Sequence, residues 1–321
     1  MKTNTVLLPG GDAAVIRVKR PDNRFPQGTS EKGIAMSIDC NSRYCAIDPY
    51  QGARMAVAEA ARNVSCVGAE PVGLTDCLNF GNPENPEIMW QFKRGVEGIS
   101  DACRELDIPV VSGNVSFYNE TNGLSVYPTP NIGMVGLLSD ITKVTSHFFK
   151  GVAHKIVLLG ESLDSSHDES MGGSEYLSWF YQQAGVRLPK FDFELEKRVQ
   201  RLVRELVDNR MIFSAHDCSE GGLAVALLES AFTKGIGAHI NYPKNIRAES
   251  LLFGESPSRV VVTVDRSHLL SLEQYCQAHR VPYAILGETL SHRFIFNDFL
   301  DLDLYELKNI WESSFEKFIQ R

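Results

Sequence analysis

The sequence lacks the features that mark several large classes of protein. Its seven cysteines include no CxxC pair, and an odd number of cysteines does not complete a disulfide framework. Their spacing does not suit a zinc site either. No apolar stretch approaches the roughly 18 residues of a membrane span, and the first residues lack the layout of a signal peptide. We therefore expect reduced thiols, no membrane partner and a cytoplasmic location.

An excess of positive charge is also missing. The 321 residues include 32 lysines and arginines against 40 aspartates and glutamates, which gives a formal net charge of −8. A surface of this sign does not attract nucleic acid, so we expect no nucleic-acid partner. An anionic phosphate ligand would need backbone amides or a metal ion to offset the protein's own charge.

The common nucleotide and hydrolase motifs are missing as well. The sequence contains no GxxxxGK[ST] phosphate loop, no GxGxxG after a strand, no GxSxG elbow and no HExxH. His167 and His216 are the histidines nearest to candidate loops. A lone histidine in a loop is more often solvated than catalytic, and we expect both to be solvated.

The chain does contain alternating strand and helix patterns, over a length sufficient for two domains. In the first part we expect strands over 13–19, 33–39, 71–78, 109–112 and 132–138, and helices over 50–67 and 87–106. In the second part we expect strands over 156–159, 211–215, 259–264 and 293–296, and helices over 175–184, 193–209, 222–232, 267–278 and 304–319. A polar, irregular stretch over 139–155 separates the two parts. The pattern predicts two α+β domains, residues 1–148 and residues 149–321.

The helix expected over 50–67 has clear start and stop signals. Asp48 and Pro49 supply an N-cap and a proline at the first helical position, and Gly68 is suited to a left-handed C-terminal cap. Alanine and other apolar residues occupy nearly every face between them. Such a helix is typically buried all round.

Glu59 is the most informative residue of that helix. A bare carboxylate among Ala, Val and Met is costly unless it is paired or bound to a metal. Asn63 lies one turn further on the same face, so the two side chains can present oxygen ligands of the kind that Mg²⁺ prefers. The alternative is an ion pair of Glu59 with Arg54 or Arg62.

Polar residues at the ends of expected strands are the next candidates. Asp12 follows two glycines and precedes a strand, although Gly-Gly-Asp also makes an ordinary turn. Asp217 lies between a strand and a helix, where α/β folds place ligands; the alternative role for this aspartate is a helix N-cap.

Three further segments have the same character. Asp76 ends an apolar strand, and the run from Ser112 to Ser116 gives a second polar strand end, so a polar pocket is expected in the first domain. The amides of 171–175 open a helix and could cradle a phosphate. From the pattern alone, the chain is interpreted as an α/β protein with a metal–phosphate site.

A series of motifs resembles the second half of the small-type phosphoribosylformylglycinamidine synthases, within the aminoimidazole ribonucleotide synthetase-like superfamily. The motifs run in order from about Leu8 to the C-terminal region. They are Asp-Cys-Asn-Ser-Arg-Tyr (39–44), Asp-Pro-Tyr (48–50), Ala-Glu-Ala-Ala-Arg-Asn (58–63), Gly-Ala-Glu-Pro (68–71), Thr-Asp-Cys-Leu-Asn-Phe-Gly-Asn-Pro (75–83), Ser-Gly-Asn-Val-Ser (112–116), Ala-His-Asp-Cys-Ser-Glu-Gly-Gly (215–222) and Leu-Lys-Asn-Ile-Trp-Glu (307–312).

The resemblance implies a fold, a reaction and partners. The N-terminal domain would form half of a barrel-like sheet, and the C-terminal domain would be an α/β layer. The family's enzymes use ATP and Mg²⁺ to activate formylglycinamide ribonucleotide for amidation by ammonia. The implied partners are the N-terminal half of the synthase, a glutaminase subunit that supplies the ammonia and a small accessory subunit.

The resemblance also implies roles for individual residues. Asp76 and Gly113 match ATP-contacting residues, Asn114 matches a Mg²⁺ ligand and Ser116 matches a substrate contact. A second Mg²⁺–nucleotide site, which can hold ADP, is matched by four residues: Asp12, Glu59, Asn63 and Asp217.

The departures from the family pattern are equally informative. The family's catalytic histidine lies in a Ser-Glu-His-Cys-Ser stretch of the N-terminal half, which this sequence does not contain. In the loop over 253–259, Pro257 stands where the catalytically active half of these enzymes has Gln. A proline removes an amide donor that could bind substrate phosphate. The resemblance therefore predicts no catalytic residue here and no synthase activity from this chain alone.

Two other functions stay open. The chain could be a non-catalytic scaffold that binds ADP–Mg²⁺ and holds a partner half in place. It could also be a stand-alone synthetase or kinase of the same superfamily acting as a homodimer, and an exposed sheet edge would favour such pairing. The glycine-rich N-terminal motifs of those stand-alone families are not found before Asp12.

Overall fold

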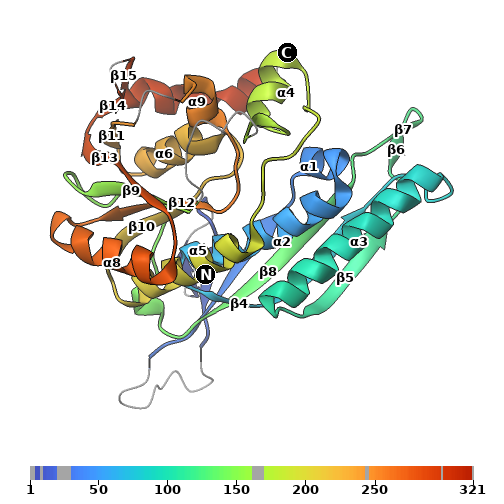
Figure 1. The fold of residues 1–321 in the computed structure, drawn as a ribbon, viewed down its shortest axis with the longest axis horizontal. Coiled ribbons are helices and arrows are strands. Elements are labelled where there is room, and N and C mark those ends of the chain that lie inside the picture. The colour runs from blue at the N-terminus through green and yellow to red at the C-terminus, as the bar shows by residue number, and fades with distance from the viewer. Residues whose placement is uncertain are drawn as a thin grey trace.

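The fold was analysed in a computed structural model, which describes residues 4–7, 10–19, 30–160, 170–242, 246–297 and 299–319. His167 and most of the loop expected before the helix at 175 lie outside these residues, as does Leu8. Figure 1 shows two α/β domains side by side, with the first sheet and its helices on the right and the second sheet with its helices on the left.

The first domain is built on a six-stranded sheet covered by helices. The strand order is β1 (Thr5–Leu7), β2 (Ala14–Arg17), β3 (Gly33–Asp39), β8 (Thr129–Leu138), β4 (Glu70–Asn79) and β5 (Val110–Ser116). Every pair is antiparallel except β4–β5, which is parallel. The helices are α1 (Ser42–Ile47), α2 (Pro49–Cys66) and α3 (Pro86–Leu106), and a short hairpin of β6 (Glu120–Thr121) and β7 (Leu124–Ser125) follows β5.

Helix α2 is the centre of this domain, and its predicted start is confirmed. The Asp48 side chain accepts hydrogen bonds from the amides of Tyr50 and Gln51, and Pro49 is the first helical residue. Most residues of α2 are buried, as its composition predicted. Helix α3 packs closely on α2 at Gly98. A Cβ at this position would collide with the Tyr50 carbonyl oxygen, so only glycine permits this approach.

The opposite face of the first sheet is open. In β3, Ala35 and Ser37 point toward the helices, whereas Met36 is 39% exposed and Ile38 is 78% exposed. Leu137 of β8 lies on the same open face and is 41% exposed. An apolar sheet face of this kind is typical of a surface that another protein layer covers.

The second domain is built on a seven-stranded sheet with a core on each face. The strand order is β10 (Ile212–Asp217), β12 (Arg259–Val264), β9 (Lys155–Gly160), β13 (Tyr283–Ser291), β11 (Ile236–Ile240), β14 (Arg293–Phe296) and β15 (Leu300–Asp303). The helices are α4 (Glu175–Tyr181), α5 (Phe193–Asp208), α6 (Gly222–Phe232), α7 (Ala248–Phe253), α8 (Leu269–His279) and α9 (Leu304–Ile319), and short 3-10 turns occupy Ile141–Lys143 and Arg266–His268.

Strand β9 shows how the two cores arise. Ile156 and Leu158 pack with α6 and α7, whereas Val157 and Leu159 pack with α5 and α8 on the other face. A strand covered on both faces is continuously apolar, which explains the uninterrupted run at 156–159. Figure 1 shows α6 and α9 above this sheet and α8 below it.

Most expected elements are present, with differences at their ends. The elements predicted over 33–39, 222–232, 259–264, 293–296 and 304–319 have the predicted bounds. The strands expected over 109–112 and 211–215 continue to Ser116 and Asp217, and α4 ends at Tyr181 instead of residue 184. Eight elements were not predicted from the sequence: β1, α1, β6, β7, β11, α7, β13 and β15. In the described part of the chain, no helix combines the length and the apolar character needed to cross a membrane.

Candidate functional site

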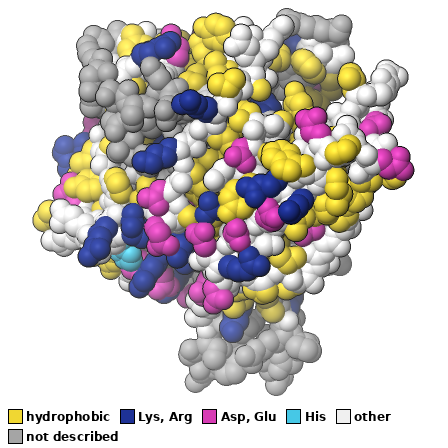
Figure 2. All heavy atoms as spheres, turned by 45° about the vertical axis from the view of Figure 1, so that its right-hand side comes forward, with side chains coloured by type: hydrophobic (Ala, Val, Ile, Leu, Met, Phe, Trp, Pro, Cys, Tyr) yellow, Lys and Arg dark blue, Asp and Glu magenta, His cyan; other side chains and the backbone are white. Residues whose placement is uncertain are grey.

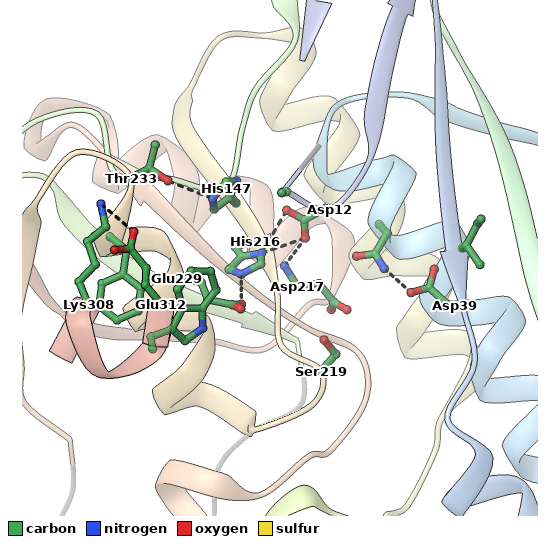
Figure 3. Close-up of a pocket in the computed structure, with 16 residues that line it drawn as sticks. Asp12, Asp39, His147, His216, Asp217, Ser219, Glu229, Thr233, Lys308 and Glu312 are labelled. Carbon is green, nitrogen blue, oxygen red and sulfur yellow. Dashed lines mark hydrogen bonds and ion pairs between the residues drawn. The ribbon is translucent and has the colours of Figure 1, made fainter. Parts of the chain in front are cut away.

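A cavity of about 510 Å³ lies at the junction of the two domains. The first domain lines it with Asp12, Asp39 and Asn63, and the second domain contributes β10, α6 and α9. Figure 3 shows Asp39 at one side of this cavity, Asp12 and His216 in its centre, and Lys308 with Glu312 at the other side. Its size is within the usual range for a small-molecule site.

His216 lies at the centre of the cavity between two carboxylates. Its Nδ1 is 3.1 Å from Asp12 Oδ1, and its Nε2 is 3.2 Å from Glu229 Oε2. Burial opposes a charge on the ring, but the Asp12 and Glu229 carboxylates outweigh that effect and raise the pKa of His216 to about 10. The expectation that this histidine is a solvated loop residue is therefore wrong.

Asp12 is held by both His216 and the backbone of β10. Burial alone would raise its pKa, but the charge and hydrogen bond of His216 hold that pKa below its usual value. The Asp217 amide also donates to Asp12 Oδ1 at 2.7 Å. The Gly-Gly-Asp segment thus does more than form a turn, because its carboxylate connects the first domain to β10.

Arg62 forms ion pairs with several acidic residues around Asp217. Its Nε donates to Asp217 Oδ1, and its Nη1 donates to Glu196 Oε2 at 2.7 Å. Glu59 Oε2 lies 3.9 Å from Arg62 Nη2, so part of the ion-pair alternative for Glu59 is present. Arg54 is not involved, because it pairs with Glu105. The N-cap alternative for Asp217 is wrong, since Gly221 caps α6.

The cluster nevertheless has more carboxylates than cations. Burial and the negative charges of Glu220, Asp217 and Asp39 raise the pKa of Glu59 well above its usual value. Burial and the Asp217 charge raise the pKa of Asp39 to about 7, against the hydrogen bond that Asn63 Nδ2 donates to it at 2.9 Å. Asp39 Oδ2 is buried and has no hydrogen-bond partner among the residues that the structure describes.

The residues around Asp39 offer oxygen donors of the kind that a hard divalent cation takes. The buried, unpartnered Asp39 oxygen and the surrounding carboxylate and amide oxygens are the donor types that Mg²⁺ takes. Within the described ranges, no three His, Cys, Asp or Glu side chains are placed so that together they could hold a metal ion. Of the predicted ligands, Asp12, Asn63 and Asp217 line the cavity, and Glu59 interacts electrostatically with Asp217 and Asp39.

The other predicted set lies at the far edge of the first sheet. Asp76 pairs with Gly113, and Asn79 pairs with Ser116, in the parallel ladder of β4 and β5. A Cβ on Gly113 would collide with the Asp76 carboxylate, so the two residues are in close contact. Burial raises the pKa of Asp76.

The residues of this set divide between the two faces of the sheet. Asp76 lies two residues from the buried Leu74 and two from the buried Leu78. Side chains two residues apart in a strand share a face, so Asp76 lies on the helix-covered face. Asn114 and Ser116 lie on the opposite, open face, one and three positions after Gly113 along β5. The two sets of residues thus lie apart, one at the domain junction and one along β4 and β5.

A carboxylate binds one amide at the start of α4 and one at the start of α6. Glu255 Oε1 accepts hydrogen bonds from the amides of Glu175 and Gly221, both at 2.8 Å. Tyr44 donates its hydroxyl to the Glu255 carbonyl oxygen at 3.0 Å. In the segment 171–175 predicted to cradle a phosphate, the Glu175 amide thus binds Glu255, and the amides of Gly173 and Ser174 donate to the carbonyl oxygens of Ala184 and Met171.

Besides His216, three acidic residues in the region of the junction cavity were not predicted to act there. Asp39 had a usable signal, because it ends a predicted strand in the same way as Asp76. Glu229 lies within α6 and Glu220 follows β10, and neither position carries a pattern that distinguishes it from an ordinary surface carboxylate.

Two family descriptions match the chain. Residues 10–138 match "AIR synthase related protein, N-terminal domain", and residues 153–295 match "AIR synthase related protein, C-terminal domain". Among curated proteins, the chain is similar to "Phosphoribosylformylglycinamidine synthase subunit PurL" from several bacteria. Identity is 43% for Alkaliphilus metalliredigens (98% of this chain, 42% of that protein), 45% for Moorella thermoacetica (100% and 42%) and 48% for Thermomicrobium roseum (96% and 41%). The chain thus spans about two-fifths of these relatives' length.

Solved structures share the fold. Thermotoga maritima PurL complexed with FGAR superposes with a TM-score of 0.71 and 18% identity, over 86% of this chain and 46% of that chain. The same protein complexed with ATP gives a TM-score of 0.69 and 19% identity, over 86% and 44%. At identities this low, the structural likeness establishes only the two-domain fold. The function of the site has to be argued from the residues themselves.

Proposed function

Because this chain belongs to the family of AIR synthase related proteins, we propose that it is the C-terminal half of a phosphoribosylformylglycinamidine synthase. The observation that carries the proposal is the 43–48% identity of nearly the whole chain to about two-fifths of PurL subunits from several bacteria. The reaction is the ATP-dependent amidation of formylglycinamide ribonucleotide in purine biosynthesis, a ligase reaction.

In this proposal the β4–β5 edge contributes to the working site. Asp76 and Gly113 contact ATP, and the close contact between them supports a shared role. Asn114 holds Mg²⁺ and Ser116 contacts the substrate, both from the open face of the sheet. The N-terminal half of the synthase covers that face, so the site is composed of residues from both halves.

The junction cavity binds a second Mg²⁺–nucleotide. Asp12, Asn63 and Asp217 hold the cation together with Glu59 and Asp39, and Arg62 and His216 orient Asp217 and Asp12 for that purpose. When bound, the cation offsets the charge of the phosphate oxygens. The buried, unpartnered oxygen of Asp39 supports this assignment.

The chemistry itself requires partners. This chain contains no Ser-Glu-His-Cys-Ser stretch, so the catalytic histidine comes from the N-terminal half. The ammonia comes from a glutaminase subunit of an amidotransferase complex that also includes a small accessory subunit. The fold of this chain is shared by the "Structure of PurLQS from Thermotoga maritima", with a TM-score of 0.70 and 17% identity. The seven cysteines are all free, which supports a cytoplasmic complex.

An ammonia-dependent synthase assay tests the proposal. The chain is assayed alone and after mixing with a fragment of a PurL relative. That fragment is the N-terminal part of the relative, to which this chain is not similar. We expect no turnover from the chain alone and measurable turnover from the mixture. Normal turnover from the chain alone, or none from a mixture that forms a stable complex, would refute the assignment.

A second candidate function is a non-catalytic scaffold that binds ADP–Mg²⁺. The convergence of Asp12, Asn63 and Asp217 on one cavity favours it, because this cavity is separate from the β4–β5 edge. Calorimetry with ADP and Mg²⁺ compares the wild type with Glu59→Ala, with exposed Glu194→Ala as the control. We expect binding to weaken only in Glu59→Ala. Absence of binding in all three proteins would exclude the scaffold.

A further inference from the structure

We propose that Trp311 of α9 forms the platform on which the base of the bound nucleotide stacks in the junction cavity. The inference rests on the proposed function of that cavity as a Mg²⁺–nucleotide site. It adds a base-recognition residue from the C-terminal helix, which supplies none of the predicted ligands.

Trp311 lines the same cavity as the proposed cation ligands. Its ring centroid is 5.6 Å from that of Phe232, at an interplanar angle of 45°. Phe232 is buried at 5% exposure, whereas Trp311 is 52% exposed. The indole is therefore supported from α6 and still has surface free for a ligand.

The chemistry of the cavity separates along its length. Asp39 lies at one side of the cavity and Asp12 and Asp217 lie near its centre, and the cation and the phosphates belong in this part. Apart from the imidazoles of His147 and His216, Phe232 and Trp311 are the aromatic side chains among the described residues that line the cavity. A nucleotide has a charged end and a flat aromatic end, and this lining offers one surface for each.

Polar groups beside Trp311 suit the edge of a base or a ribose. Lys308 and Glu312 line the cavity on the same helix, and Lys308 Nζ lies 3.6 Å from Glu312 Oε1. They offer a donor and an acceptor next to the indole. Figure 3 shows both side chains at the opposite side of the cavity from Asp39.

Fluorescence tests the contact directly, because the chain has only three tryptophans. Trp90→Phe together with Trp179→Phe leaves Trp311 as the single tryptophan; these two residues lie on α3 and α4 and are both exposed. In this protein we expect ADP with Mg²⁺ to change the Trp311 emission. Pyrophosphate with Mg²⁺, which carries no base, should leave it unchanged.

Calorimetry on Trp311→Ala and Trp311→Phe provides the affinity test. Base stacking on an aromatic ring contributes about 1–3 kcal/mol, so we expect Trp311→Ala to weaken ADP binding by about fivefold or more. Trp311→Phe should retain most of the affinity, and pyrophosphate should bind all three proteins alike.

The remaining outcomes are distinct. If ADP binds and Trp311→Ala has no effect, or if this variant loses pyrophosphate as well, the stacking platform is wrong and the nucleotide site stands. If the wild type binds neither ADP nor pyrophosphate in the presence of Mg²⁺, the nucleotide site itself is wrong and the platform falls with it.

Discussion

Arg62 of α2 and Asp217 of β10, 155 residues apart in sequence, form a buried ion pair that joins the two domains. Arg62 also binds Glu196 of α5, whose carboxylate accepts a further hydrogen bond from Ser258. One guanidinium thus connects three segments of the second domain to the central helix of the first. It fixes Asp217 at the wall of the cavity.

Replacement of Arg62 should destabilise the protein strongly. Arg62→Met leaves Asp217 and Glu196 without their cation in the interior, and the loss of one partner of a buried ion pair costs about 3–5 kcal/mol. Urea denaturation measures the free energy of unfolding. The control is Arg104→Met, which breaks an exposed pair with Asp101 and should cost less than about 1 kcal/mol. Equal losses in the two variants would contradict the structural role of Arg62.

Strongly patterned elements of the fold could be predicted from the sequence. The helix α6 and the strand β12 have the predicted bounds, because each combines a continuous apolar run with clear flanking residues. Strands β11 and β13 were missed because Gly237 and Gly287 interrupt their patterns. A Cβ on Gly237 would collide with the backbone of β14, so the residue that weakens the pattern is the one that permits the ladder.

The candidate site could be predicted only where its residues share an element. Glu59 and Asn63 could be paired from helical spacing alone, and both belong to the carboxylate cluster. The role of His216 could not be predicted from the sequence. Its partner Asp12 is 204 residues away, and its other partner, Glu229, lies in the helix that follows, α6. Its strand also extends past the apolar run, where Asp217 pairs with Val260 of β12.

The stability of the protein should fall between about pH 5 and pH 7, partly through Glu255. Burial raises the pKa of this carboxyl to about 7, against the hydrogen bonds from Gly221 and Glu175. The folded state therefore holds the Glu255 proton more tightly than the unfolded chain does. Stability decreases as the pH rises from the glutamate pKa in the unfolded chain, about 4.3, through the pKa in the folded state, about 7.

Glu255→Gln isolates that contribution. The glutamine oxygen can still accept from both amides but does not titrate, so the fall in melting temperature between pH 5 and pH 7 should be smaller than in the wild type. The exposed substitution Glu194→Gln should leave the wild-type pH dependence unchanged. An identical slope in Glu255→Gln and the wild type would show that Glu255 ionises normally.

Gly113→Ala should impair the reconstituted synthase without unfolding this chain. The added methyl group would occupy the position of the Asp76 carboxylate, and a displacement of about 1 Å in a positioning group can cost about 100-fold in rate. Gly73→Ala on the same strand pair is the control, because its Cβ would meet Val111 Cγ1 at an ordinary 3.5 Å. Activity within about twofold of the wild type in Gly113→Ala would argue against a role for the Asp76–Gly113 contact.

The open face of the first sheet leads to a prediction about assembly. Figure 2 shows hydrophobic side chains among charged ones on the side of the molecule that includes α3, so exposed apolar groups are not confined to the sheet. The sheet face differs because two of its exposed residues, Met36 and Leu137, each pair with a partly buried apolar residue of the neighbouring strand. Met36 pairs with Val135, and Ile34 pairs with Leu137. Such a continuous surface favours a second layer of protein over scattered contacts.

Met36→Asp should prevent this chain from binding the N-terminal half of the synthase. Met36 is 39% exposed, so an aspartate there remains hydrated in the isolated chain but would be buried without a partner under a second layer. Co-elution of the two halves in size-exclusion chromatography measures binding, and circular dichroism checks that the variant is folded. Leu270→Asp on α8, where the leucine is 65% exposed, should still bind. If Met36→Asp co-elutes as well as the wild type, the partner covers some other surface, and the β4–β5 edge is not completed in the proposed way.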